Sequence, residues 1–453
     1  MRLFSRRPAL LGALLGWLLL AGNSQADSSQ PTHEFTLDNG LRVIVREDHR
    51  APVVVSQLWY RVGSSDEPPG LTGISHALEH MMFKGSERVA PGQASRLLSQ
   101  LGAQENAFTS RDYTAYYQII GRDQLAIALE LEAERMHRLS LPEDEFLREM
   151  EVIREERRLR VDDNPNGLAW ERFSTQAWMA SPYGQPVIGW MHDIERLSID
   201  DLRYWYQRHY RPANALLVVV GDVTLDEVRG LAERYFGPVP GTPAPPRKAA
   251  LELPGGGERF IQLRPGVQLP TLLMAFNVPG LQTAAEPWEA DALRLLAAVL
   301  DGGYSSRLIS RLERGSQLAT RAGASYDGFT RGDSLFVFSG IPNNARGVDL
   351  QQLEQALWEQ IEELQNQPPT EAELQRARTR MQASQVYARD SISQQATQIG
   401  QLESLGLSWQ LIDSDTERLA QISPEQVSEV ARRYLQRERL TRAHVLPDQE
   451  NQP

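Results

Sequence analysis

Two histidines and a glutamate stand close together in the segment His76, Ala77, Leu78, Glu79, His80. If this segment is helical, His76 and His80 share one face, a single turn apart, where they could bind the same metal ion. Glu79 then lies at the flank of that face, where its carboxylate could reach a metal-bound water without binding the metal. The segment therefore predicts a zinc site with two histidine ligands and Glu79 as the general base.

The spacing H-x-x-E-H is the inverted form of the H-E-x-x-H signature of zinc proteases. With eight histidines in 453 residues, a chance match is expected about once in a hundred such chains. The alternative interpretation is a helix whose histidines are only buried and hydrogen-bonded. A third ligand elsewhere in the chain would decide between the two.

A candidate for the third ligand lies on a later amphipathic segment. On a helical projection Phe146, Met150 and Ile153 define its buried face, and Glu149 and Glu156 both fall at the edge of that face. Carboxylates turned towards a core are costly unless a cation or hydrogen-bond donors meet them. Glu156 is therefore the candidate third zinc ligand, with Glu149 behind it as an alternate ligand or as a partner that orients a ligand. The alternative is a helix with a charged, solvated surface.

The N-terminus has the pattern of a signal peptide over residues 1–26. A basic start precedes an apolar run over 9–21, and Ser24 and Ala26 provide small residues at a cleavage site. The run is shorter than the roughly 20 residues that span a bilayer, so a stable membrane span is not expected. We expect a mature chain that begins near Asp27 and is exported, to the periplasm of a Gram-negative bacterium. The general secretory and twin-arginine routes both stay open.

Composition excludes several function classes. The formal net charge is −12, and removal of 1–26 makes it −15 because three arginines and no acid are lost. An acidic protein is poorly suited to phosphate backbones, so no nucleic-acid partner is expected. The chain has no cysteine, which excludes disulfides, thiol nucleophiles and cysteine-bound zinc. Hydrophobic content of 41% fits a soluble globular protein.

The length and the order of the expected elements indicate an α+β protein with an internal duplication. We expect an N-terminal zinc-binding domain over 30–238, a linker rich in proline and glycine over 239–257, and a similar C-terminal domain over 258–447 that lacks the zinc motif. The first-half segments are strands over 34–45, 53–62, 106–109, 112–120 and 215–220, and helices over 94–101, 124–137 and 225–236. The second-half segments are strands over 260–263, 272–278 and 335–339, and helices over 288–300, 306–312, 348–364, 370–390 and 424–435.

Three local signals refine these elements. The helix over 288–300 takes the place of the metal-binding helix, and the helix over 424–435 corresponds to the one over 225–236. Thr72 or Ser75 could cap the start of the metal-binding helix. Ser140 and Glu143 have the spacing of a capping box for the helix that carries Glu156.

These features resemble the M16 (pitrilysin-type) zinc metallopeptidases, in particular the shorter two-domain branch with mitochondrial processing peptidase and its bacterial periplasmic homologues. The resemblance covers nearly all of the chain after 1–26. Besides H-x-x-E-H and Glu156, it rests on Phe83, Lys84, Gly85, Asn106, Ala107, Thr109, Thr114, Tyr116, Tyr183, Gly184, Gly189, Tyr210, Pro212, Asn214, Gly221 and Asp222.

The resemblance implies two α/β-sandwich half-domains of the LuxS/MPP-like metallohydrolase type and a zinc-dependent endopeptidase activity. It implies that His76, His80 and Glu156 hold one zinc ion per chain and that Glu79 activates the bound water. It also implies that the strand formed by Asn106, Ala107, Phe108 and Thr109 pairs with a peptide substrate. An exposed sheet edge beside a metal would bind an extended peptide through its main chain.

One departure from the family pattern concerns the second half. Complete family members carry an arginine and a tyrosine in a stretch like L-R-x-x-x-G-L-x-Y, whereas the matching positions here are Glu313 and Thr320. Arg314, Arg321 and Tyr326 lie near but do not restore the spacing. We therefore expect a heterodimer in which a homologous subunit without H-x-x-E-H supplies this pair, with a homodimer as the alternative. A second function class, a structural or assembly subunit, is less compatible with the intact ligand set.

Overall fold

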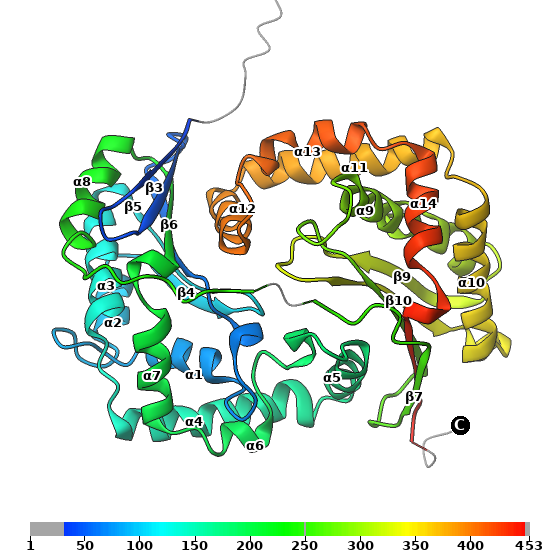
Figure 1. Ribbon diagram of the computed structural model, residues 1–453, viewed down its shortest axis with the longest axis horizontal. Helices are drawn as coiled ribbons and strands as arrows, with labels where there is room; N and C mark the ends of the chain where they lie inside the picture. Colours follow the sequence, from blue (N-terminus) through cyan, green and yellow to red (C-terminus); the bar gives the residue numbers. More distant parts are fainter. Residues whose placement is uncertain (1–30, 249–250, 449–453) are drawn as a thin grey trace, which may run out of the picture.

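A computed structural model describes residues 31–248 and 251–448 of the chain. The predicted signal peptide over 1–26 lies outside the described residues, as do positions 249–250 of the predicted linker. The described chain forms two α+β halves, one built on a six-stranded sheet and the other on a five-stranded sheet (Figure 1). This arrangement confirms the predicted fold class.

The two sheets have the same topology. The first contains β1 (Thr32–Thr36), β2 (Arg42–Glu47), β3 (Val53–Tyr60), β4 (Gln104–Thr109), β5 (Thr114–Gly121) and β6 (Ala215–Gly221). The second contains β7 (Arg259–Leu263), β8 (Thr271–Val278), β9 (Ala319–Tyr326), β10 (Ser334–Pro342) and β11 (Leu440–Val445). The order β2-β6-β3-β5-β4 matches the order β7-β11-β8-β10-β9, and only β2/β6 and β7/β11 pair in parallel among the described strands. Strand β1 is added at the edge of the first sheet.

The helices follow the same duplication. The first half has α1 (Ile74–Met81), α2 (Gln93–Gln100), α3 (Leu125–Arg138), α4 (Glu143–Arg157), α5 (Pro165–Ala177), α6 (Met191–Ile194), α7 (Ile199–His209) and α8 (Leu225–Tyr235). The second half has α9 (Trp288–Asp301), α10 (Leu350–Asn366), α11 (Glu371–Arg389), α12 (Ile392–Leu405), α13 (Leu411–Ala420) and α14 (Pro424–Tyr434). Helix α9 follows β8 as α1 follows β3, as expected. Helix α14 precedes the last strand of its sheet as α7 does, so the correspondence of 424–435 with 225–236 is wrong.

Alternation along β3 gives the first sheet two buried faces. Leu58 and Tyr60 point towards α1, α3 and α4, where they join a core that includes Leu78 and Ile153. Trp59 points to the opposite face and is fully buried there. Since both faces are covered, this sheet has no solvated side at β3.

The helix that covers the second face comes from the other half of the chain. Ala396, Ile399 and Leu402 of α12 pack on Trp59 and its neighbours, and Gly400 lies so close that a Cβ there would meet the indole ring. In return, Phe173 of α5 packs on the second sheet. Figure 1 shows α12 beside β6 and α5 beside β7. The two halves therefore exchange one helix each, which joins them through two apolar cores.

A buried arginine adds a polar link between the halves. Arg331, in the β9–β10 hairpin, donates to Asp66 Oδ1 at 2.9 Å, to Asp112 Oδ1 at 3.1 Å and to Ser65 Oγ at 2.6 Å. The Tyr183 hydroxyl donates to Asp112 Oδ2 at 2.5 Å. Charge-assisted hydrogen bonds in a buried setting fix geometry well. The hairpin of the second half is therefore held against the loop that precedes α1.

Both predicted helix caps are wrong. The cap of α1 is Gly73, whose φ of 86° is left-handed, and the carboxylate of Glu67 accepts from the backbone N–H groups of Gly73 at 2.7 Å and Ser75 at 2.8 Å. Helix α4 starts after Pro142 without a side-chain cap. A capping group that comes from outside the helix has no local sequence signature.

Candidate metal centre

The helix that carries the histidines is fixed at its start by two glycines. Gly73 and Gly189 pass so closely that a Cβ on either would collide with the backbone of the other segment. Thr72 Oγ1 donates to Asp193 Oδ2 at 2.6 Å and accepts from the Trp190 N–H at 3.0 Å. The first turn of α1 is thereby locked to the segment before α6, and the imidazoles of the following turns take a defined direction.

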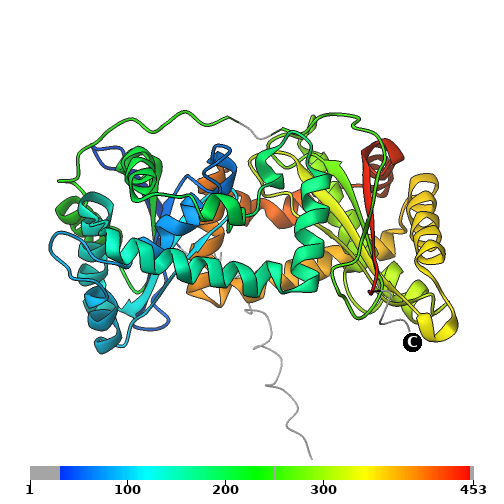
Figure 2. The ribbon, with the colours of Figure 1, turned by 90° about the horizontal axis from the view of Figure 1, so that it is seen from below.

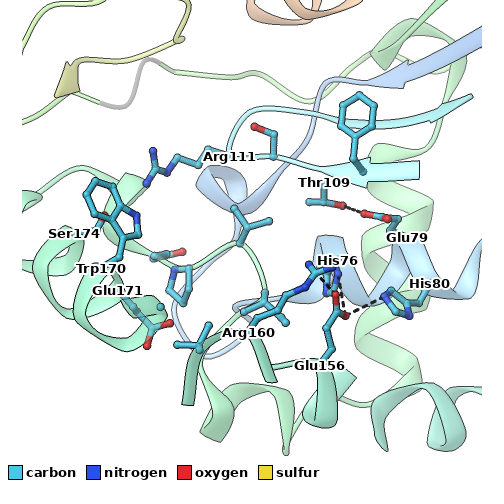
Figure 3. A pocket seen from close by; sticks show the side chains of 18 of the residues that line it. His76, Glu79, His80, Thr109, Arg111, Glu156, Arg160, Trp170, Glu171 and Ser174 are labelled. Carbon is cyan, nitrogen blue, oxygen red and sulfur yellow. Dashed lines mark hydrogen bonds and ion pairs between the residues drawn. The ribbon is translucent and has the colours of Figure 1, made fainter. Parts of the chain in front are cut away.

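Three side chains from two helices meet beside this turn, as Figure 3 shows. Glu156 Oε2 of α4 lies 3.6 Å from Nε2 of His76 and 3.5 Å from Nε2 of His80. The two imidazole rings have centroids 4.8 Å apart. One ligand atom from each of the three residues lies within 4.8 Å of the others. The structure thus brings together His76, His80 and Glu156, which the sequence selected as ligands.

The donor set fits a zinc ion. A tetrahedral site with metal–ligand bonds of about 2.0–2.1 Å has ligand atoms about 3.3–3.4 Å apart, close to the two separations from Glu156 Oε2. That oxygen is buried and makes no hydrogen bond to any described residue. Two imidazole nitrogens and a carboxylate oxygen are also the ligand types that zinc accepts, with a fourth position left open.

The surroundings shift the pKa values of His76 and His80 in opposite directions. Burial and the neighbouring His80 lower the pKa of His76 to about 4, so His76 is neutral at pH 7 and offers a lone pair. Burial opposes protonation of His80, but the carboxylates of Glu156 and Glu149 outweigh it and raise the pKa of His80. A cation bound here would therefore replace the proton of His80 as the partner of these acids.

Further polar contacts hold the ligands in place. Glu149 Oε2 lies 3.0 Å from His80 Nδ1, and Lys84 Nζ lies 2.5 Å from Glu149 Oε1. Arg160 Nη1 lies 2.8 Å from Glu156 Oε1, which leaves Oε2 turned to the imidazoles. Glu149 is therefore placed behind His80, outside the three-residue cluster. Carboxylates in that position fix the tautomer and the orientation of a ligating histidine.

Glu79 lies on α1 between the histidines and the nearby strand β4. The hydroxyl of Thr109 donates to its Oε2, and no described residue forms a hydrogen bond to Oε1. Burial outweighs this hydrogen bond and raises the pKa of Glu79. A carboxylate with a raised pKa and one free oxygen has the properties of a general base.

The candidate site opens into a pocket of about 840 Å³. Its lining includes the residues of the predicted substrate strand: Asn106, Ala107, Phe108 and Thr109. The opposite wall comes from α5, with Trp170, Glu171 and Ser174 (Figure 3). A volume of this size is in the range of ligand and substrate sites.

Strand β4 is the last strand of its sheet, so one of its edges is unpaired. The Ser110 N–H donates to Tyr113 O at the hairpin, and the antiparallel alternation then turns the main-chain groups of Ala107 and Thr109 to the open edge. The Ala107 N–H is instead met by Asn106 Oδ1 at 2.8 Å. The edge has free positions for an added strand, and Asn106 covers one of them.

Four residues that shape this site were not predicted from the sequence. Arg160 stands four positions after Glu156, a spacing that brings side chains together on a helix and could have revealed the pair. Lys84 was singled out in the sequence only because the segment Phe83, Lys84, Gly85 resembles the M16 family, and no role was predicted for it. Glu67 and Trp170 reach the site through the tertiary fold, for which the sequence contains no local signal.

In the second half, Glu313 and Thr320 are not arranged as a substrate clamp. Glu313 Oε1 accepts from the Ala322 N–H at 2.8 Å and so supports the start of β9. Thr320 is exposed on β9, an edge strand of the second sheet that pairs only with β10. These positions have taken up local structural roles.

Fold and site together define a class: a duplicated α+β protein with an inverted H-x-x-E-H metal motif in its first half. Comparison with known families agrees, because the family model described as insulinase (peptidase family M16) matches residues 42–190. A second model, described as the peptidase M16 inactive domain, matches residues 196–381. The chain belongs to the peptidase M16 family.

Relatives in bacteria carry zinc protease names. The chain is 32% identical over 383 residues to the zinc protease PqqE of Helicobacter pylori, a match covering 83% of this chain and 84% of the relative. It is 25% identical over 398 residues to the uncharacterized zinc protease YmxG of Bacillus subtilis, covering 88% of this chain and 94% of the relative. The crystal structure of a protease from Helicobacter pylori superposes with a TM-score of 0.85 at 28% identity, over 92% of this chain and 100% of that one.

No helix among the described residues is both long and apolar enough to cross a bilayer.

Proposed function

We propose that this chain is a zinc-dependent endopeptidase that cleaves peptides or unfolded segments, with one zinc ion per chain held by His76, His80 and Glu156. The observation that carries the proposal is the position of Glu156 Oε2, which faces the Nε2 atoms of both histidines without a hydrogen bond of its own. A buried carboxylate oxygen without a hydrogen bond is costly unless a cation meets it. The zinc protease names of the relatives support the same choice of metal.

The bound zinc would polarise the peptide carbonyl and lower the pKa of water at the open position. Glu79 takes the proton of the attacking water on Oε1, while Thr109 holds Oε2. The same carboxyl then gives the proton to the leaving amine, for which its raised pKa is suited. Positioned proton transfer of this kind accelerates a reaction by about 10²–10⁴-fold.

The edge of β4 is the proposed substrate-binding strand. An extended peptide would add to the sheet through the main-chain groups of Ala107 and Thr109. Such binding gives affinity without dependence on side chains, so cleavage preference would come from the pocket walls, including Trp170 on α5. Addition of the strand requires Asn106 to release the Ala107 N–H.

A partner subunit would complete the site. Glu313 and Thr320 stand where complete family members carry arginine and tyrosine, so this chain lacks that pair of oxyanion and substrate contacts. Loss of one such contact lowers the rate by about 10²–10³-fold. We propose a heterodimer in which a homologous subunit without H-x-x-E-H supplies them. A homodimer that uses other residues is the alternative.

A second candidate function, a structural or assembly subunit, is favoured by one observation. Glu313 is engaged with the backbone of Ala322 rather than with a ligand site, as expected if the second half has lost its catalytic contribution. The first half argues against this candidate, because a scaffold needs neither the histidine pair nor the inward carboxylates.

The proposed location of the mature chain is outside the cytoplasm, in the periplasm. The proposal rests on the pattern over 1–26. N-terminal sequencing of the protein from a fractionated cell should return a residue near Asp27. A cytoplasmic protein that begins at Met1 would contradict the proposal.

The test of the activity is Glu79→Gln. This change removes the base and no ligand, so we expect a loss of peptide hydrolysis of at least about a hundredfold with zinc content unchanged. The matched control is Glu155→Gln, an exposed acid on α4 whose ion pair with Arg158 lies away from the site. Hydrolysis that survives in the Glu79 variant would exclude the proposed base.

The test of the partner uses the purified chain alone and with copurifying homologues. We expect zinc binding by the isolated chain but weak hydrolysis, and a large increase with a homologue that carries the arginine and tyrosine. Substitution of Glu313→Arg with Thr320→Tyr should restore only part of the rate, because Glu313→Arg also removes the acceptor of the Ala322 N–H. Full activity of the isolated chain would overturn the heterodimer.

A further inference from the structure

The second half has a pocket between the helices that correspond to the metal-binding pair. Helix α9 follows β8 as α1 follows β3, and α11 follows α10 as α4 follows α3. The space between the end of α9 and α11 forms a pocket of about 590 Å³. Small residues make room for it, among them Ala298, Gly302 and Ala383.

The charges on this pocket are positive. Arg376 and Arg380 of α11 both line it, four residues apart and hence on one face of the helix. Both are exposed, and neither makes an ion pair or hydrogen bond with a described residue. The acid in the lining, Glu373, is already bound by Arg307 through two contacts of 2.8 and 3.0 Å. Arg376 and Arg380 therefore remain without a hydrogen bond or close ion pair among the described residues, although Asp301 at the end of α9 attracts Arg380 electrostatically.

A buried hydroxyl in the same wall also lacks a partner. Ser306 is 8% exposed, lines the pocket, and its Oγ forms no hydrogen bond with any described residue. Gly303 nearby has a φ of 118°, and a Cβ there would meet the guanidinium of Arg380. The backbone therefore leaves space for this guanidinium. A buried hydroxyl without a partner is available to donate a hydrogen bond to a bound ligand.

We propose that this pocket binds a carboxylate of a peptide through Arg376, Arg380 and Ser306. Guanidinium groups have only donors and match the two oxygens of a carboxylate, and the serine hydroxyl is a further donor. The identification of the ligand as a peptide rests on the proposed peptidase function. The carboxylate comes from the C-terminus or from an acidic side chain, since both present the same group.

The contrast with the first half supports this assignment. There, a helix pair presents two histidines four residues apart together with carboxylates, a set suited to a cation. Here α11 presents two arginines four residues apart, and Asp301 is the acid of α9 that lies within electrostatic reach of Arg380. Such a pocket would anchor the peptide away from the metal and would select substrates that carry a negative charge.

The test measures binding of three acetylated pentapeptides to the zinc-loaded Glu79→Gln protein by calorimetry at low salt. The peptides are pentaalanine amide, pentaalanine with a free C-terminal carboxylate, and the amide with aspartate at its centre. We expect at least one of the charged peptides to bind about tenfold more tightly than the neutral amide, the effect of one charge-assisted pair. The charged peptide that binds more tightly shows whether the pocket takes the C-terminal carboxylate or that of an acidic side chain.

Variants then locate the effect. Arg376→Gln with Arg380→Gln should reduce the tenfold preference to about twofold or less, and Ser306→Ala should reduce it in part. The matched control is Arg208→Gln, another exposed arginine without an ion pair, on α7, which should keep the full preference. Zinc content and circular dichroism of each variant check that the site in the first half and the fold are intact.

Three results would overturn the inference: equal binding of all three peptides, a preference that survives loss of both arginines, or tighter binding of orthophosphate than of either charged peptide. Failure of the proposed function is distinguished by a separate assay, hydrolysis by the protein with Glu79 intact in the presence of a copurifying homologue that carries the arginine and tyrosine. An arginine-dependent preference without hydrolysis would contradict the function alone, and hydrolysis without the preference would contradict the inference alone.

Discussion

Helices α1 and α4 of the first half and helices α9 and α11 of the second half occupy equivalent places beside sheets of the same topology. The first pair gathers His76, His80 and Glu156 around a point where ligand atoms converge. The second pair has apolar residues on α9 and arginines on α11. The difference shows that the duplicated scaffold fixes where a site lies, whereas its chemistry depends on a few side chains on two helices.

The two halves also differ at the start of these helices. The first turn of α1 is capped by Glu67, which meets no cation among the described residues. Near the start of α9, Glu289 accepts from the Ala285 N–H and lies against Arg433 and Tyr434. The start of α1 is thus held by a buried carboxyl without a cation, and the start of α9 contains a buried acid in an ion pair.

The largest expected effect tests whether the metal belongs to the first half alone. His80→Ala removes a ligand and should lower the zinc content from about one ion per chain to near none, with loss of peptide hydrolysis. The control is His444→Ala in the second half, where the histidine lies 3.2 Å from Glu354 and outside the pocket. Elemental analysis after dialysis measures both. Zinc retained by His80→Ala, or lost from His444→Ala, would contradict the assignment of the metal site to the first half alone.

The second effect concerns the contrast between Glu67 and Glu289. Burial outweighs the hydrogen bonds from Ser75 and Gly73 and raises the pKa of Glu67 to about 7 from 4.5. Between these values the folded state holds a proton that the unfolded chain has lost, so stability falls as pH rises from about 4.5 to 7, by on the order of 3 kcal/mol. Thermal unfolding should show a steeper decline over this window than in Glu67→Gln, which mimics the neutral carboxyl. Parallel curves for the two proteins would refute the assignment.

The third effect separates the residue behind His80 from the ligands themselves. Glu149→Ala removes the partner of His80 Nδ1 and of Lys84, and zinc affinity should fall about 10–100-fold without loss of the site. Glu151→Ala, an exposed neighbour on α4 paired with Arg154, should leave the affinity unchanged. Competition with a chromophoric chelator measures the two constants. If the zinc affinity of Glu149→Ala is unchanged, Glu149 does not contribute to the metal site.

The smallest effect tests the helix exchange. Gly400→Ala places a Cβ against the buried Trp59 ring, and we expect a loss of about 1 kcal/mol or more from overpacking. The opposite sign is expected for Gly230→Ala in α8, where nothing lies near: a gain of about 0.5–1 kcal/mol from better helix propensity. Chemical denaturation of both variants compares them. Equal stability of the two variants would show that α12 does not depend on close contact with the first sheet.

The parts of the molecule that the sequence predicted are those encoded by local spacing. The H-x-x-E-H segment requires only that one helix form, and Glu156 followed from the helical period of Phe146, Met150 and Ile153, all of which are buried. The duplication was visible from the order of elements, and the topology of the sheets bears it out. Local periodicity is enough where the partners share an element.

The parts that the sequence analysis missed depend on distant contacts or weak patterns. Strand β9 consists mostly of small residues and was not predicted. Helix α12 was not predicted because it is polar along much of its length. The apolar residues of α12 are explained only by the first sheet, on which this helix packs. The capping of α1 by Glu67 likewise depends on a loop that folds back onto the start of the helix. Local helix propensity does not predict such a contact.

The exchange of α5 has a mechanical consequence for the pocket. The candidate ligands His76, His80 and Glu156 stand on helices that pack on the first sheet, whereas the opposite wall stands on α5, which packs on the second sheet. Figure 2 shows α4 crossing from one half to the other before α5 turns along the second. A small rotation between the halves would therefore move one wall of the pocket against the other. The width of the pocket therefore depends on how the first and second sheets are placed relative to each other.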